Sequence, residues 1–224
     1  LSQRQNNFML SVTHELKTPL TSIQLALQTL QKRKLSESNQ EVLISKALSE
    51  NQRLAALIDN ILNASRIESN GFIPKLDDFA IESFLEKKKE EINRSLGSPV
   101  VSLICNVSRI KADSFMIETI FNNLLENALK YSGGDPKLQI SVNKNDKIIK
   151  AIVSDQGPGI SSEEREQIFT KFYRIGNEDT RAQKGSGLGL FITSEFVHLH
   201  RGKIFCESNT PKGTKFIIEL PNEK

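Results

Sequence analysis

Apolar side chains near the start of the chain recur at alternating steps of four and three residues. They are Leu16, Leu20, Ile23, Leu27 and Leu30. This spacing is the heptad of helices that pack in bundles, and it predicts one long helix over residues 1–34. A turn over residues 35–39, with several residues that favour helix caps, separates it from a second helix that runs to about Ser69.

The second helix repeats the same heptad spacing. Its stripe consists of Leu43, Ala47, Glu50, Leu54, Leu57 and Ile61, and Ile58 and Leu62 widen it. Two helices of this length form a hairpin that cannot cover both of its apolar faces. A second copy of the hairpin would complete a four-helix bundle, so we expect a homodimer. The alternative is that the hairpin packs on the rest of its own chain.

The pattern changes after Asn70-Gly71, which ends the second helix, and Pro74, which prevents its continuation. We therefore expect a helical domain at residues 1–69, a linker at 70–76 and a second domain at 77–224. In the second domain we expect helices at 80–95, 114–131, 161–169 and 188–200, and strands at 100–107, 138–143, 147–154, 203–207 and 214–220. Strands paired as hairpins with helices between them predict an α+β sandwich, in which a mixed sheet carries helices on one face.

The composition indicates a globular protein but does not identify its function. The 224 residues are 38% hydrophobic and 25% charged, with a formal net charge of +3, as in one or two globular domains. The small excess of positive charge does not predict nucleic-acid binding, and Lys87-Lys88-Lys89 lies among glutamates on an expected solvated helix face. Two cysteines exclude a disulfide framework.

The sequence contains neither a signal peptide nor an apolar run of the roughly 18 residues that a membrane span needs. Because it starts at Leu1 inside a helical pattern, we expect a piece of a longer protein.

The first candidate site is His14. In the heptad, His14, Glu15 and Thr18 take outward positions, and His14 and Thr18 share one exposed strip. A carboxylate beside an exposed imidazole can accept a proton from one ring nitrogen and leave the other as a nucleophile. Pro19 should bend the helix just after the histidine. The alternative is an ordinary solvated histidine. For His198 and His200, which end an expected helix without a metal-like partner set, we expect favourable charge at the helix C-terminus or simple surface exposure.

The second candidate site begins on the helix expected at 114–131. Asn123, Asn127 and Lys130 lie on one face, four and three residues apart. Amide oxygens suit Mg²⁺ that shares its coordination with phosphate and water, and a lysine can neutralise phosphate charge. The alternative is an amphipathic helix with incidental amides.

Two glycine-rich segments add to this site. Asp155-Gln156-Gly157-Pro158-Gly159-Ile160 follows a strand, where a carboxylate can accept a hydrogen bond from an amine such as N6 of adenine. A plain Gly-Pro turn is the alternative. Gly185-Ser186-Gly187-Leu188-Gly189-Leu190 opens a helix whose N-terminus favours anions. No regular βαβ succession surrounds it, so a dinucleotide fold is disfavoured. The polar stretch that follows Arg174 and runs through Lys184 is a candidate lid.

These segments resemble a known family. Residues 11–20, Ser-Val-Thr-His-Glu-Leu-Lys-Thr-Pro-Leu, resemble the phosphoacceptor box of sensor histidine kinases. Residues 123–131, 155–160, 169–174 and 185–190 resemble, in order, the N, G1, F and G2 boxes of their Bergerat-type ATP-binding domain, and residues 210–214 resemble its final Gly-Thr turn. The resemblance implies that His14 receives a phosphoryl group from ATP. It also implies that Glu15 acts as a base and that Thr18 helps to dephosphorylate a partner response regulator.

The same resemblance implies the nucleotide-binding residues. Asn127 would ligate Mg²⁺, Asn123 and Lys130 would hold phosphates, Tyr131 would lie near the adenine, and Asp155 would bind it. The further residues implied in the ATP site are Gly157, Gly159, Ile160, Phe172, Arg174, Lys184, Gly185, Ser186, Gly187, Leu188, Gly189 and Thr214. Hydrolytic relatives of this fold carry a water-activating Glu where this chain has Asn123, so the pocket is expected to hold ATP for transfer. The alternative from another class is a non-catalytic dimeric scaffold that binds nucleotide.

The expected protein is thus the cytoplasmic core of a membrane-anchored bacterial sensor. It would use ATP and Mg²⁺, form a homodimer, pass phosphate to a receiver domain, and meet the membrane only through segments before Leu1. The sequence leaves open the stimulus, the cognate regulator, the balance of kinase and phosphatase activity, and whether transfer occurs within or between protomers.

Overall fold

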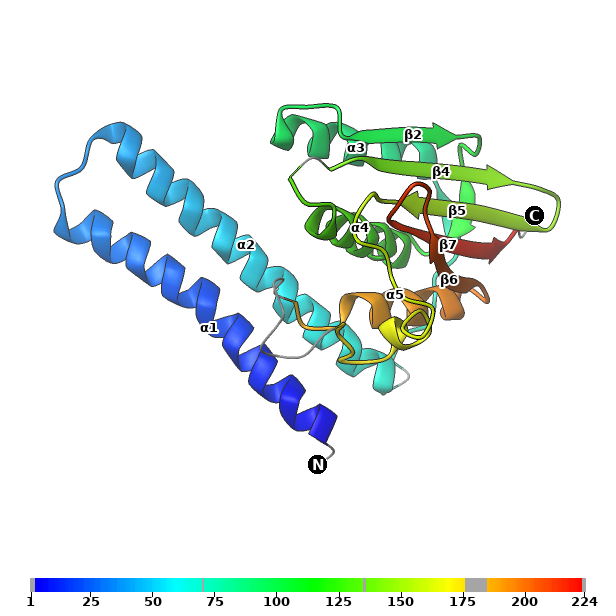
Figure 1. The fold of residues 1–224 in the computed structure, drawn as a ribbon, viewed down its shortest axis with the longest axis horizontal. Coiled ribbons are helices and arrows are strands. Elements are labelled where there is room, and N and C mark those ends of the chain that lie inside the picture. Colours follow the sequence, from blue (N-terminus) through cyan, green and yellow to red (C-terminus); the bar gives the residue numbers. More distant parts are fainter. Residues whose placement is uncertain (1–2, 70, 135, 176–184, 223–224) are drawn as a thin grey trace.

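A computed structural model describes residues 3–69, 71–134, 136–175 and 185–222, and it divides into a helical hairpin and an α/β unit (Figure 1). The hairpin consists of α1 (Gln3–Lys32) and α2 (Glu37–Glu68). Ser36 caps α2 by accepting a hydrogen bond from the Asn39 N–H. No helix in the described part of the chain combines the length and apolar character that a bilayer crossing requires.

The buried stripe of α1 is offset by one position from the predicted seam. Val12, Pro19 and Ala26 are buried, whereas Leu20 and Leu27 are 57% and 56% exposed. The predicted stripe of α2 is half-buried along its whole length. The chain therefore uses one set of apolar residues inside the hairpin and leaves a second set on its surface.

The far end of α2 packs against the α/β unit, as the alternative to a dimer would require. Ala64 belongs to the main hydrophobic core, Ile61 and Ile67 pack against that core, and α2 contacts α5. This packing does not cover the rest of the hairpin, where Leu20, Leu27, Ile58 and Leu62 remain exposed.

The α/β unit is built on a five-stranded sheet in the order β2-β4-β5-β7-β6. Its strands are β2 (Val101–Cys105), β4 (Leu138–Lys144), β5 (Ile148–Ser154), β6 (Lys203–Ser208) and β7 (Thr214–Pro221). The β2–β4 pair is parallel and the other pairs are antiparallel, so the predicted mixed sheet is confirmed.

A second, two-stranded sheet was not predicted. It pairs β1 (Asp77–Phe79) with β3 (Ile110–Ala112). Each strand has only three residues, which is too short for an alternating pattern to distinguish it from a loop.

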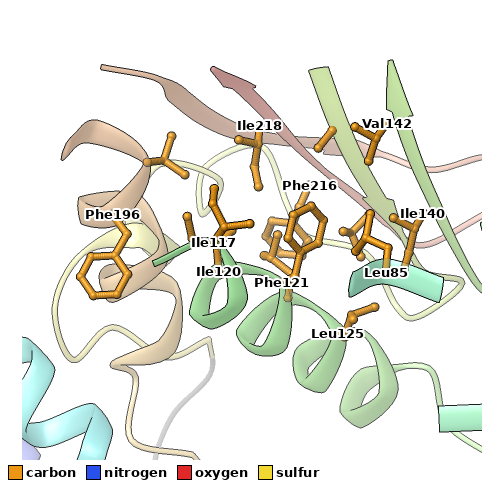
Figure 2. Close-up of a cluster of buried hydrophobic side chains, with 14 of the residues drawn as sticks. Leu85, Ile117, Ile120, Phe121, Leu125, Ile140, Val142, Phe196, Phe216 and Ile218 are labelled. Atoms are coloured by element: carbon orange, nitrogen blue, oxygen red, sulfur yellow. The ribbon is translucent and has the colours of Figure 1, made fainter. Parts of the chain in front are cut away.

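Three helices cover one face of the larger sheet: α3 (Ile81–Leu96), α4 (Ser114–Tyr131) and α5 (Gly189–Leu199). Figure 2 shows the core between these helices and the sheet, where Ile120 and Phe121 of α4 face Ile140 and Phe216 of the sheet. The prediction of a helix at residues 161–169 was wrong. That segment forms turns and a short 3₁₀ helix, η1 (Gln167–Phe169), because its first residues are polar and only its end reaches the core.

The linker after α2 is held against the α/β unit by an aromatic cluster. The ring of Phe72 lies 5.1 Å from that of Phe196 and 6.3 Å from that of Phe115. The N–H of Lys75 also donates a hydrogen bond of 2.9 Å to the Asp113 carboxylate. The linker thus docks where α4 begins.

Of the two expectations for His200, surface exposure was wrong, because the side chain is buried beside the same junction. Its Nε2 accepts a 3.0 Å hydrogen bond from the N–H of Asp113, and its Nδ1 lies 2.7 Å from the carbonyl of Phe196. Asp113 in turn caps α4. The ring therefore joins the end of α5 to the start of α4.

Candidate functional site

A cavity of about 1040 Å³ lies where the hairpin meets the α/β unit. Its walls come from α1, α2, α4, the loop after β5, the segments on both sides of residues 176–184, and the start of β7. The predicted site residues that line it are Glu15, Asn123, Asn127, Lys130, Tyr131, Asp155, Gly159, Ile160, Arg174, Gly185, Ser186, Gly187, Gly189 and Thr214. Segments far apart in the sequence therefore meet at one site.

Three predicted residues lie behind the wall of the cavity. The N–H of Gly157 donates to the Asp155 carboxylate, and the N–H of Phe172 donates to the carbonyl of Gly187. Leu188 is fully buried in the core. Lys184 and most of the expected lid lie outside the described residues.

Asp155 is held at the end of β5 by two backbone hydrogen bonds. Its Oδ1 accepts from the N–H of Gly157 at 2.8 Å and from the N–H of Thr214 at 3.1 Å. Burial raises the pKa of Asp155, and these two hydrogen bonds offset part of that rise. One carboxylate oxygen is thus fixed by the backbone, while the other is the candidate acceptor for a ligand amine.

Helix α4 divides its side chains between the core and the cavity. Leu124 and Leu125 are buried in the core, whereas Asn127 and Lys130 line the cavity. Asn123 lines it as well, but its Nδ2 donates to the carbonyl of Gly189 at 3.0 Å and to Thr193 Oγ1 at 3.3 Å. The amide of Asn123 therefore joins α4 to α5 and leaves its oxygen as the atom that can face a ligand.

The glycines before α5 permit close approach of the backbone. A Cβ on Gly187, where φ is +69°, would lie 2.9 Å from the backbone of Phe172 and Tyr173. A Cβ on Gly185 would lie 2.7 Å from Lys130 Nζ. Residues 185–189 thus form a narrow wall beside the ammonium group of α4, as expected of a phosphate-binding segment.

Positive charge gathers at the hairpin side of the cavity. Lys130 is half-buried, and this desolvation, followed by the guanidinium of Arg174, lowers its pKa, while Glu15 opposes the shift. Arg174 Nη1 lies 3.8 Å from Glu15 Oε1. This ion pair joins the α/β unit to α1 across the cavity.

The three hairpin residues of the phosphoacceptor box differ in their surroundings. His14 is exposed, as the heptad predicts. Thr18 Oγ1 donates to the carbonyl of His14 at 3.0 Å, one turn earlier in the helix. Glu15 was expected to face outward, and this was wrong: it is buried against the cavity, and its Oε1 has no hydrogen bond among the described residues. The heptad could not reveal this burial because residues more than 100 positions later enclose the side chain.

The residues present fit a magnesium ion that is bound mainly by a ligand. The half-buried amide of Asn127 lines the cavity. The described residues contain no group of three or more His, Cys, Asp or Glu side chains that could hold a metal by themselves. A Mg²⁺ here would therefore take much of its coordination from phosphate and water oxygens, as is common for this ion.

Sequence reasoning missed a wall of the cavity. Arg53, Ala56, Leu57 and Asn60 of α2 line it, although Leu57 was expected only as part of the hairpin stripe and the other three were not singled out. These residues lie on one face of α2 over two turns, and their side chains form no motif that would indicate a binding site. The face becomes a wall of the cavity only because the α/β unit docks against it.

Comparisons with known proteins match both parts of the chain. The profile described as histidine kinase-, DNA gyrase B-, and HSP90-like ATPase matches residues 112–224. The profile described as His Kinase A (phospho-acceptor) domain matches residues 4–70. Each half of the cavity thus comes from a separately recognised domain.

Individual relatives align over most of the chain. Sensor protein SrrB of Staphylococcus aureus is 28% identical over 99% of this chain, which spans 39% of SrrB. The structure of Acinetobacter baumannii histidine kinase AdeS has a TM-score of 0.69 and 25% identity, and covers 94% of this chain and 98% of that one. Histidine kinase ThkA in complex with response regulator protein TrrA shares the fold, with a TM-score of 0.65, 22% identity, and coverage of 99% of this chain and 64% of that one.

Proposed function

Since the chain belongs to the histidine kinase-, DNA gyrase B-, and HSP90-like ATPases and carries a His Kinase A phospho-acceptor domain, we propose that it transfers the γ-phosphoryl group of ATP to His14. The observation that carries this proposal is the position of α1 against the cavity. His14 is exposed to an incoming group, and its neighbour Glu15 lines the cavity together with Asn127 and Lys130. The acceptor is therefore adjacent to the site where the donor would bind.

The proposed reaction is an in-line phosphoryl transfer. A ring nitrogen of His14 attacks the γ-phosphorus, the bond from that phosphorus to the bridging oxygen breaks, and ADP leaves. Glu15 takes the proton from the other ring nitrogen. To do so, its carboxylate must turn from Arg174 toward the imidazole. Positioning and charge neutralisation supply most of the rate.

The cavity residues divide the work of holding ATP. Asp155 accepts a hydrogen bond from the adenine amine, and Tyr131 lies near the base. Lys130 and residues 185–189 bind the phosphates, and Asn127 would hold a Mg²⁺ that offsets phosphate charge. The side chain of Asn123 is an amide, which cannot take a proton from water, and this favours transfer to a side chain over hydrolysis.

A second transfer and a dimer complete the proposal. The phosphoryl group passes from His14 to an aspartate of a response regulator, which docks on the hairpin, and Thr18 assists its later dephosphorylation. That the similarly folded ThkA was solved with response regulator TrrA supports such a partner. Two hairpins pair through the exposed face that contains Leu20, Leu27 and Ile58.

The domain division and the cellular setting belong to the same proposal. Residues 1–69 would dimerise and accept phosphate, 70–76 would link the domains, and 77–224 would bind ATP. Because SrrB is a longer sensor protein, we propose that further segments of this protein anchor it to a membrane and place this core in the cytoplasm.

Labelling with γ-³²P ATP tests the transfer. We expect acid-labile, base-stable label on the protein, lost in His14→Gln and retained in the control His198→Gln, which alters another exposed histidine. Label that persists in His14→Gln would refute the acceptor. A wild-type chain that binds ATP but takes up no label would instead support the non-catalytic scaffold.

A further inference from the structure

Arg53 of α2 is a basic group in the cavity that the proposed reaction does not use. Its side chain is 45% exposed and lines the same cavity as Lys130 and Gly185. Its nearest acidic partner is Glu50, whose carboxylate oxygen lies 3.8 Å from Nη1, beyond hydrogen-bond distance. Within the described ranges, the guanidinium makes no hydrogen bond.

The charged side chains around Arg53 would favour the binding of an anion. Arg53, Lys130 and Arg174 bring three cations to one end of the cavity, where the lining carboxylates are Glu15 and Glu126. After burial and Arg174, the charge of Arg53 also contributes to the lowered pKa of Lys130, so the two cations are close enough to repel each other. An anion bound between them would relieve this repulsion.

The position of the hairpin indicates which part of a nucleotide would lie there. Asp155 and residues 185–189 belong to the α/β unit and would hold the base and the inner phosphates. The phosphate that is transferred must face α1, because His14 lies on that helix. Arg53 lies on α2 in the same wall as Glu15, and therefore on the side that the terminal phosphate must approach.

We propose that Arg53 binds the terminal phosphate of a nucleoside triphosphate, so that the phosphoacceptor hairpin itself distinguishes the triphosphate from the diphosphate. This inference rests on the proposed function, since it requires a nucleotide in the cavity. A guanidinium presents two parallel N–H donors that match phosphate oxygens. The nucleotide would thus join the two domains, and its conversion to the diphosphate would remove the group that Arg53 holds.

Calorimetric titration of the whole chain tests this assignment. The ligands are Mg·AMPPNP, a triphosphate analogue, and Mg·ADP. The variants are Arg53→Gln, Arg53→Lys and, as the matched control, Arg66→Gln, which removes an exposed arginine of α2 that lies outside the cavity. For Arg53→Gln we expect about tenfold weaker binding of the analogue and less than a twofold change for ADP. Arg53→Lys should lose less, and Arg66→Gln should match the wild type.

Each other outcome overturns the inference in a recognisable way. Equal weakening of both ligands by Arg53→Gln would show that the arginine only supports the shape of the cavity. Unchanged binding of both would show that it does not contact the nucleotide, and the proposed function would stand without it. A wild-type chain that binds neither ligand would refute the proposed function together with this inference.

Discussion

Replacement of Asp155 separates its observed role, which is to hold the backbone, from its proposed role, which is to bind the adenine amine. In Asp155→Asn, the amide oxygen can still accept from the N–H groups of Gly157 and Thr214, while an NH₂ group replaces the second carboxylate oxygen. That group cannot accept a hydrogen bond from the adenine amine. Loss of a hydrogen bond to a charged acceptor costs about 1.5–3 kcal/mol, so ATP affinity should fall about 10- to 150-fold.

The stability of the ligand-free chain should move in the opposite direction. Because burial raises the pKa of Asp155 on folding, the ionised carboxylate destabilises the fold above this pKa, and the penalty disappears as the pH falls below about 3.9, the ordinary value for Asp. Asp155→Asn removes the penalty, so at pH 7 its free energy of unfolding should equal or exceed that of the wild type. Asp155→Ala instead leaves two buried N–H groups without an acceptor, which should cost about 2 kcal/mol or more.

Calorimetry with ATP and urea denaturation of the same samples measure both effects. Wild-type ATP affinity in Asp155→Asn would show that the free oxygen does not contact the base. Equal stability of the Ala and Asn variants would show that the backbone hydrogen bonds around Asp155 contribute nothing.

Three further predictions concern the framework of the site. Gly213 has a φ of +111°, and a Cβ there would collide with the carbonyl of Asp155, so Gly213→Ala should lower the free energy of unfolding by about 2 kcal/mol or more in urea denaturation. Gly134→Ala, with open space around it, is the control, and equal effects would contradict the argument. His200→Leu should cost about 1–3 kcal/mol in the same assay, because both nitrogens of this buried ring bond to backbone groups, and unchanged stability would oppose this. Leu27→Asp, which places a charge on the exposed hairpin face, should shift the mass measured by light scattering from dimer to monomer, whereas a persistent dimer would place the interface elsewhere.

The larger elements could be predicted because each carries its own periodicity. The helices α1, α2 and α4 and the β4–β5 hairpin appear close to the expected residues, although the buried stripe of α1 is offset by one position from its heptad. Local patterns failed where an element was too short or where its stabilisation came from elsewhere. The strands Asp77–Phe79 and Ile110–Ala112 stabilise each other across 30 intervening residues. The segment before Gln167–Phe169 has helix-forming residues but too few apolar contacts to keep it helical.

In the candidate site, too, the residues in local motifs could be predicted, whereas those that depend on distant contacts could not. Asn127, Lys130 and Asp155 could be named from the sequence because each lies in a segment whose local pattern suggests its chemistry. The burial of Glu15 and the place of Arg53 in the cavity could not, because both depend on how the hairpin docks on the α/β unit. Docking is a long-range property to which no single segment of the chain points.

The packing of Phe72 against Phe115 and Phe196 has a mechanical consequence. The ring follows α2 by only four residues and contacts both Phe115 in the first turn of α4 and Phe196 of α5, whose own rings lie 6.0 Å apart. Packed cores transmit displacement because they cannot compress. In the proposed kinase, a rotation of α2 would therefore be passed through this aromatic cluster to α4, and would move Asn127 and Lys130 relative to α1 without any loss of secondary structure.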